Sequence, residues 1–172
     1  LIMEKLPATI ELTVFAMIMA ILIAVPLGMI TALKRDRPAD YVGSVVAVIG
    51  ISIPSFLLGI LLIMFLAVEF RIFPAAGYGG SLTGSVRELV TTGDPSALRE
   101  SLRYLFLPGI TLGVAAAAYN ARMVRSAMIE VLGQDYIRAA EAKGLKRSTV
   151  VLRHALRNAL IPVITILGLQ IG

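Results

Sequence analysis

The chain has 172 residues, of which 58% are hydrophobic, and its formal net charge is +5. A soluble domain is closer to half apolar, so the excess indicates a protein whose solvent is lipid. There is no cysteine and only one histidine, which excludes a disulfide framework, a thiolate metal site and a multi-histidine metal site within this chain. The sequence starts at Leu1 and stops at Gly172 inside an apolar run, so we expect it to be part of a longer polypeptide.

The first membrane-spanning segment is expected over residues 10–33. A helix needs roughly 20 mainly apolar residues to cross a bilayer core about 30 Å thick, and this stretch supplies them. Its only charged residue, Glu11, lies near one end, where a carboxylate can reach the membrane interface. The basic run that begins at Lys34 ends the segment.

The second segment, residues 42–68, contains no charged residue and has a proline in its middle. Because Pro54 lacks the N–H of a helical hydrogen bond, we expect a kink or local unwinding there. Backbone groups freed at such a break need a polar lumen or a neighbouring helix, so Ser52, Pro54 and Ser55 are candidates for lining a translocation path. An ordinary packing kink is the simpler interpretation of the same residues.

A polar stretch with several glycines, residues 69–103, separates the second segment from the third. Its glycines indicate turns, and a short helix is expected near Ser85–Val90. The third segment covers residues 104–124 and the fourth covers 155–172. The sequence therefore predicts an all-α fold, a polytopic transmembrane helical bundle that forms one domain with about four spans.

The placement of lysine and arginine sets the expected orientation. Residues 34–41 and 121–158 together hold 11 of the 16 basic residues. The four arginines of residues 69–103 are balanced there by four acidic residues. We therefore expect residues 121–158 on the cytoplasmic side and residues 69–103 outside. Three residues are expected to mark the cytoplasmic rim: Asn120, Arg122 and Arg125.

The cytoplasmic loop, about residues 125–154, is longer than a connection between two spans requires, and its pattern indicates two amphipathic helices. Asp135 is the expected N-cap of the first helix. Gly144 suits the left-handed residue that commonly closes a helix, with Leu145 folding back on it. The second helix is expected to begin near Ser148 and to run into the fourth span.

The first of these helices has a slim face, because three of its residues are alanine. Four residues share one side at spacings of three and four: Tyr136, Ala139, Ala140 and Lys143. Such a face permits close approach of a partner protein. Two other interpretations stay open: a basic amphipathic helix that only anchors the protein at the membrane surface, and a DNA-binding helix-turn-helix, which the direct fusion to a span disfavours.

The same loop resembles that of the integral-membrane permeases of ABC importers, whose pattern is E-A-A-x-x-x-G followed by I-x-L-P. Residues 138–144 match its two alanines and its glycine and depart at Arg138, where the general pattern has glutamate. Residues 154–157 also depart, since His and Ala precede the leucine and Arg follows it. In full, residues 136–145 and 152–162 closely resemble the dipeptide/oligopeptide permeases, specifically the first of their two membrane subunits.

The resemblance implies an ABC importer permease fold in which the helix before the glycine is a coupling helix, seated in a cleft of a cytoplasmic ATPase subunit. By resemblance, six residues form or flank that contact: Ala139, Ala140, Glu141, Lys143, Gly144 and Leu145. Further implied partners are a second homologous permease subunit and an extracytoplasmic substrate-binding protein. ATP and magnesium would be bound by the ATPase, so we expect no cofactor, metal site or catalytic residue in this chain. Membrane lipid surrounds it, and no nucleic acid is expected to bind.

The expected function is import of dipeptides or oligopeptides across the inner (cytoplasmic) membrane of a prokaryote, driven by ATP hydrolysis on a separate chain. Nickel or glutathione import stays open within the family, as does pairing with an identical permease. An ATP-independent carrier or channel would need ionisable groups near mid-bilayer, and the spans offer only Glu11. A membrane-embedded enzyme would need acids or histidines clustered at one depth. A non-transporting membrane scaffold is the remaining alternative.

Overall fold

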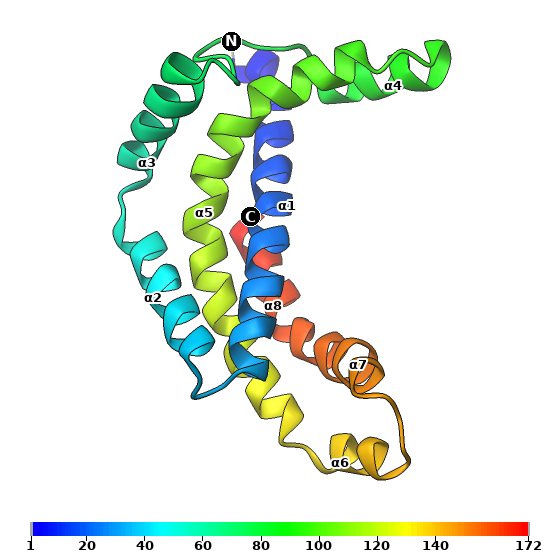
Figure 1. The fold of residues 1–172 in the computed structure, drawn as a ribbon. Helices are drawn as coiled ribbons and strands as arrows, with labels where there is room; N and C mark the ends of the chain where they lie inside the picture. Colours follow the sequence, from blue (N-terminus) through cyan, green and yellow to red (C-terminus); the bar gives the residue numbers. More distant parts are fainter. Residues whose placement is uncertain (1, 172) are drawn as a thin grey trace. The chain divides into compact units, whose positions relative to one another are not determined.

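The computed structural model describes residues 2–171, and the side chains of residues 6–168 (Figure 1). This part of the chain consists of helices and their connections and contains no strand, so the predicted all-α fold is confirmed. The elements in chain order are α1 (Ile2–Leu33), α2 (Pro38–Ser52), α3 (Ser55–Leu62), the π-helical η1 (Ile63–Glu69), α4 (Leu82–Thr92), α5 (Ser96–Leu132), α6 (Asp135–Ala142), α7 (Arg147–Thr149), the π-helical η2 (Val150–Ala155) and α8 (Leu156–Ile171).

Three described helical segments are long and apolar enough to cross a membrane: Leu6–Leu33, Ser96–Leu132 and Arg147–Gly168. A fourth exists if α2 and α3–η1 count as one broken span. The helices α1 and α5 extend beyond residues 10–33 and 104–124, because polar residues continue a helix past its apolar part. The short helix expected near Ser85–Val90 is α4.

At Pro54 the chain breaks the helix completely. α2 ends at Ser52, Pro54 takes an extended conformation with φ −57° and ψ 133°, and α3 begins at Ser55. The proline has no N–H to donate, and its ring disfavours a helical conformation for the residue before it. The expected kink is therefore a full interruption between two helices.

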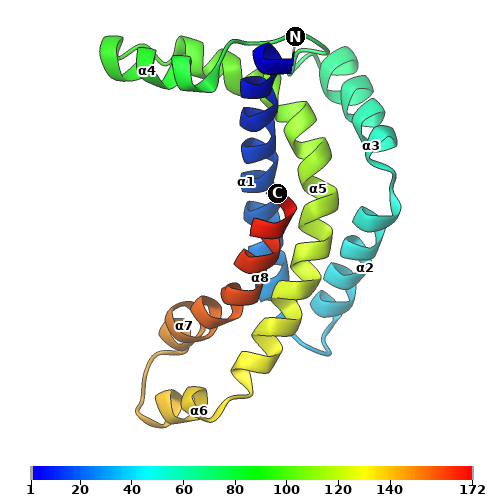
Figure 2. The ribbon, with the colours of Figure 1, turned by 180° about the vertical axis from the view of Figure 1, so that it is seen from behind.

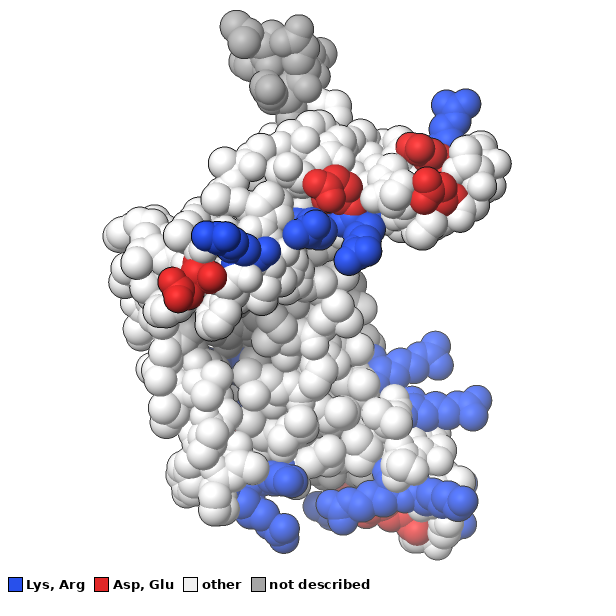
Figure 3. Space-filling model, turned by 45° about the horizontal axis from the view of Figure 1, so that its top comes forward, with Lys and Arg blue, Asp and Glu red and all other residues white. Residues whose placement is uncertain are grey.

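The chain divides into two compact units, each built from segments far apart in the sequence. The first unit contains Leu1–Met19 and Ile53–Ala115, and the second contains Ala20–Ser52 and Ala116–Gly172. The second unit holds 11 of the 16 basic residues and five of the 11 acidic ones. On the face drawn in Figure 3, red and blue side chains lie together around α4 in the first unit, whereas blue ones predominate in the second.

Small side chains bring the helices of the second unit together. A buried cluster contains two alanines from α1 and two from α5: Ala20, Ala24, Ala117 and Ala121. A Cβ added at Gly28 of α1 would lie 2.6 Å from the backbone oxygen of Ala121, so these helices touch through their backbones. Interfaces between membrane helices favour small residues because close approach increases van der Waals contact.

Aromatic rings and a glycine pack the first unit. Gly109 of α5 faces the Phe15 ring of α1, and a Cβ at that position would overlap the ring. Phe73, in the connection after η1, stacks on Phe106 of α5 with 4.4 Å between the ring centroids. The first contact joins α1 to α5, and the second holds the irregular connection between η1 and α4 against α5.

Glu11 of α1 caps the N-terminus of α4 within the first unit. Its carboxylate accepts hydrogen bonds from the Ser81 hydroxyl at 2.7 Å, the Leu82 N–H at 3.1 Å and the Thr83 N–H at 3.3 Å. The first N–H groups of a helix have no partner inside the helix, and the helix dipole favours a negative charge there. Glu11 therefore joins α1 to α4 through the end of that helix.

Replacing Glu11 with Ala removes this cap, and we expect α4 to lose about 1–2 kcal/mol of stability against local opening. Amide hydrogen exchange at Leu82 and Thr83 measures that loss as roughly 5- to 30-fold faster exchange. Glu11→Gln keeps an acceptor oxygen and should lose less. Glu88→Ala, on α4 itself, is the matched control, and equal exchange in the Glu11 and Glu88 variants contradicts the capping role.

Candidate functional site

The N-cap of α6 lies one residue earlier in the chain than the sequence predicted. Gln134 is its N-cap, with an extended φ of −75° and ψ of 148°, and Asp135 is already the first helical residue. The prediction of Asp135 as N-cap is therefore wrong. The reason is that the Gln134 carbonyl accepts the first helical hydrogen bonds, from the Ile137 N–H at 3.1 Å and the Arg138 N–H at 3.4 Å, which places Asp135 inside the first turn. It still places a negative charge in the first turn, which the helix dipole favours.

The C-terminus of α6 ends in a Schellman motif at Gly144. The Leu145 N–H donates to the Ala140 carbonyl at 3.4 Å, and the Gly144 N–H donates to the Glu141 carbonyl at 2.9 Å. Gly144 has a φ of +77°, which side-chain-bearing residues adopt only with strain. The prediction that Gly144 is the left-handed residue closing this helix is therefore confirmed.

One side of α6 packs on the rest of the second unit, and the other side is open. Ile137 is only 2% exposed and therefore lies on the packed side of the helix. Ala140, one turn on, is half-buried beside it. The other residues of the candidate contact are exposed to solvent: Ala139, Glu141, Lys143, Gly144 and Leu145. The structure therefore places five of the six candidate residues on accessible surface.

A side-chain hydrogen bond ties α6 to the last helix. The Asn158 amide of α8 donates to the Tyr136 hydroxyl at 2.7 Å. Figures 1 and 2 show α6 lying beside the helical segment formed by α7 and η2, which runs directly into α8. Tyr136 is 43% exposed, as the sequence pattern predicts, but its hydroxyl is engaged by α8.

An ion pair between α2 and α5 was not predicted from the sequence. Asp40 accepts two hydrogen bonds from Arg125, from Nε and from Nη2, each 2.7 Å long. The Asp40 side chain is only 5% exposed, and it also accepts from the Asp36 N–H at 3.1 Å. Such a two-point pair fixes both distance and orientation. The available signal was an acidic residue in the first turn of a helix that is otherwise uncharged.

The three candidates for a translocation path flank the break between α2 and α3. The Ser52 hydroxyl donates to the Val48 carbonyl at 2.8 Å, so it is used within its own helix. Pro54 is the N-cap of α3 and Ser55 its first residue. All three are exposed. Their role in a path stays a prediction.

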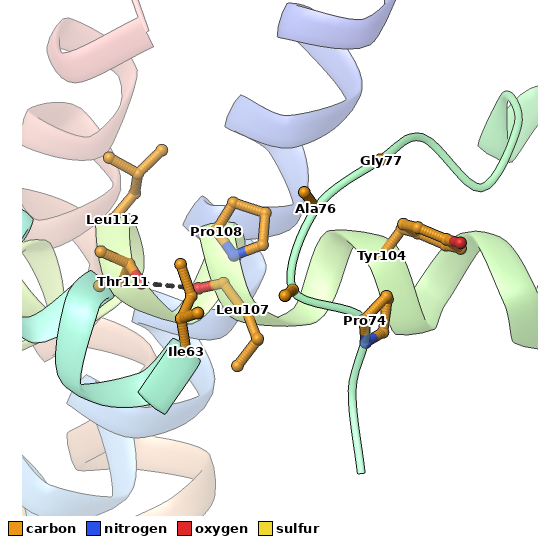
Figure 4. Close-up of a pocket in the computed structure, with 11 residues that line it drawn as sticks. Ile63, Pro74, Ala76, Gly77, Tyr104, Leu107, Pro108, Thr111 and Leu112 are labelled. Atoms are coloured by element: carbon orange, nitrogen blue, oxygen red, sulfur yellow. Dashed lines mark hydrogen bonds between the residues drawn. The ribbon is translucent and has the colours of Figure 1, made fainter. Parts of the chain in front are cut away.

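A cavity of about 410 Å³ lies inside the first unit, between α3–η1, the connection after η1, and α5 (Figure 4). Six of its lining residues define its walls: Ile63, Ala76, Tyr104, Pro108, Thr111 and Leu112. The Thr111 hydroxyl donates to the Leu107 carbonyl at 2.7 Å. No charged side chain is found among the lining residues that the structure describes.

Comparison with known proteins assigns the chain to one family. The family described as binding-protein-dependent transport system inner membrane component matches residues 24–172. The chain is 44% identical to the dipeptide transport system permease protein DppB of Alkalihalophilus pseudofirmus, over 97% of this chain and 52% of that protein. It is 40% identical to DppB of Escherichia coli K12 (98% and 52%) and 40% identical to the glutathione transport system permease protein GsiC of Salmonella typhi (95% and 47%).

The long apolar helices and the bacterial relatives define the class, a multi-pass bacterial membrane protein. The chain belongs to the inner-membrane components of binding-protein-dependent transport systems, in the peptide branch of the ABC importer permeases. The resemblance seen in residues 136–145 and 152–162 is thereby confirmed. This is a family of transport permeases and not of enzymes. The chain spans about half the length of the curated relatives it matches.

Proposed function

We propose that the chain is the membrane-spanning permease subunit of an ATP-driven importer of dipeptides or short oligopeptides, and that α6 receives force from a separate ATPase. The observation that carries this proposal is α6 itself. It is an eight-residue helix, packed on one side through Ile137, open on the other at Ala139 and Lys143, and closed by Gly144. A helix held this way suits transmission of a push from a partner to the spans.

Three connections support transmission from α6. The Tyr136–Asn158 hydrogen bond joins it to α8, and α6 also packs against η2, which runs into α8. The short turn through Gly133 joins it to the end of α5, with the Gly133 N–H donating to the Glu130 carbonyl at 3.1 Å. From α5 the Arg125–Asp40 pair continues to α2. Movement of α6 would thus carry several helices of the second unit together, as rigid-body transitions require.

The charge distribution supports the orientation this role needs. Residues 121–158 are rich in lysine and arginine, which the positive-inside rule assigns to the cytoplasm, where an ATPase can reach α6. Residues 69–103, with balanced charges, would then face outside and offer a surface to a substrate-binding protein. A second permease subunit would complete the path, and ATP and Mg²⁺ would be bound by the ATPase.

Relatives named for dipeptide transport support peptide cargo, and the relative named for glutathione, at 40% identity, makes glutathione the second candidate. Glutathione is itself a short peptide with one unusual linkage, so both cargoes share an amide backbone and charged ends. Nickel import lacks such support among these relatives.

The test uses the full-length protein, expressed with its ATPase, second permease and binding protein, and reconstituted into liposomes. We expect the ATPase to co-purify and labelled dipeptide to enter only with ATP. Labelled glutathione, offered separately, distinguishes the two cargoes. Uptake that needs an ion gradient and proceeds without ATP would establish the ATP-independent carrier instead, and absence of any uptake with normal assembly would favour a scaffold.

A further inference from the structure

We propose that the cavity of the first unit holds an uncharged side chain, together with part of the backbone, of a peptide in transit. This proposal rests on the proposed function and names a place where the imported peptide contacts the permease. The site is distinct from the break at Pro54 that the sequence suggested. Figure 4 shows side chains of α5 and η1 and the connection after η1 around one space.

Two kinds of wall meet in this cavity. Ile63, Leu107 and Leu112 supply apolar side chains from helices. The opposite wall is the irregular backbone from Pro74 to Gly77. Gly77 has a φ of +120°, and a Cβ added there would lie 2.7 Å from Cε1 of the Tyr104 ring. An occupant would therefore meet hydrocarbon on one side and peptide groups on the other.

The α5 wall also contains an unusual helical carbonyl. Pro108 lies inside α5 and has no N–H, so the Tyr104 carbonyl four residues earlier cannot receive its usual helical hydrogen bond. Both residues line the cavity. Backbone polar groups at membrane depth are tolerated where they are buried in protein or line a water-filled cavity. The Tyr104 carbonyl can therefore accept a hydrogen bond from water or from a donor group of an occupant.

These walls favour a peptide over a lipid acyl chain. An acyl chain cannot donate to the Tyr104 carbonyl or to the carbonyls of Pro74–Gly77, so it would displace water from these acceptors without replacing the hydrogen bonds, whereas a peptide can donate its N–H groups. The lining residues that the structure describes include no charged side chain, so the cavity offers no counter-charge to the charged ends of a peptide. A volume of about 410 Å³ lies at the lower end of the roughly 300–1,000 Å³ found for small-ligand sites, which suits one large side chain with its amide group.

The test compares uptake of Phe–Phe and Gly–Gly by the reconstituted full-length complex, with the binding protein saturated so that its own affinity does not enter. Ala76→Phe adds a ring to the cavity wall at an exposed position of the connection, so it should not disturb a packed core. We expect it to lower the maximal uptake rate of Phe–Phe roughly tenfold relative to that of Gly–Gly, the discrimination an apolar pocket can supply. Leu112→Ala, which enlarges the cavity, should shift the ratio the other way.

Val90→Phe is the matched control, because it adds the same ring to an exposed position of α4 outside the cavity. It should leave the ratio unchanged. A ratio that also stays unchanged in Ala76→Phe and Leu112→Ala, whether or not both rates fall, overturns the proposal and assigns the cavity to packing or lipid. If the wild-type complex imports neither peptide, it is the proposed function that fails, and the two outcomes are therefore separable.

Discussion

Asp40→Asn is expected to lower the free energy of unfolding by about 3 kcal/mol. Loss of one partner of a buried ion pair costs about 3–5 kcal/mol, and the low end applies because Arg125 keeps 29% of its side-chain exposure and can turn toward water. The variant keeps the shape of the carboxylate but leaves the guanidinium without its counter-charge. Thermal unfolding in detergent should show a melting temperature lower by roughly 6–12 °C.

The neighbouring Asp36 provides the control. Its pair with Arg35 is 3.5 Å long, its side chain is 77% exposed, and such surface pairs contribute only about 0–1 kcal/mol. Asp36→Asn also tolerates the left-handed φ of +60° at this position. If the Asp40 and Asp36 variants melt together, the Asp40–Arg125 pair is not a stabilising contact. In the double variant Asp40→Asn with Arg125→Gln, the two losses should not add, since no unpaired charge remains.

The Asp40–Arg125 pair also shows where sequence reasoning stops. The second span was predicted to start at residue 42, which left Asp40 in a connection, and Arg125 was expected at the rim with Asn120 and Arg122. In the structure Asn120 is buried to 1% exposure, and Arg125 meets a residue 85 positions away. Hydropathy gives the depth of a residue along one helix, but it contains no information about which helix lies opposite.

The turn at Gly144 was predictable because its physics is local. A helix end, a left-handed residue and two backbone hydrogen bonds within six residues are all encoded in consecutive positions. The N-terminus of the same helix was misassigned by one residue, since Asp135 serves as well inside the first turn as before it. Which side of α6 faces outward needed the tertiary fold, because burial of Ile137 and the bond from Asn158 decide it.

Glu11 and the cavity are further features that depend on contacts between segments far apart in the sequence. The sequence marked Glu11 as a charge near the end of a span, and interfacial depth was the natural interpretation. Its function as a cap for α4 depends on a segment 70 residues further along the chain. The cavity likewise combines η1, the connection after it and α5, so that no single stretch of sequence contains its pattern.

Gly144→Glu is expected to reduce ATP-dependent peptide uptake at least tenfold while the protein still inserts into the membrane. A side chain in the left-handed conformation costs about 1–2 kcal/mol, which a folded membrane protein tolerates. A Cβ at Gly144 has no atom of the described structure within 4 Å, so no internal clash adds to that cost. Any larger loss must arise where a partner approaches. The measurement is peptide imported per ATP hydrolysed, together with the amount of ATPase that co-purifies.

Gly93 supplies an internally matched comparison. It closes α4 with a φ of +74°, and a Cβ there also has no neighbour within 4 Å, so Gly93→Glu carries the same strain and the same added charge. It lies on the segment proposed to face outside, away from an ATPase. We expect Gly93→Glu to retain ATPase co-purification and the ratio of uptake to hydrolysis, and Gly144→Glu to lose at least one of them. Equal behaviour of the two variants would mean that α6 receives no force from an ATPase at Gly144, since everything except location is shared between them.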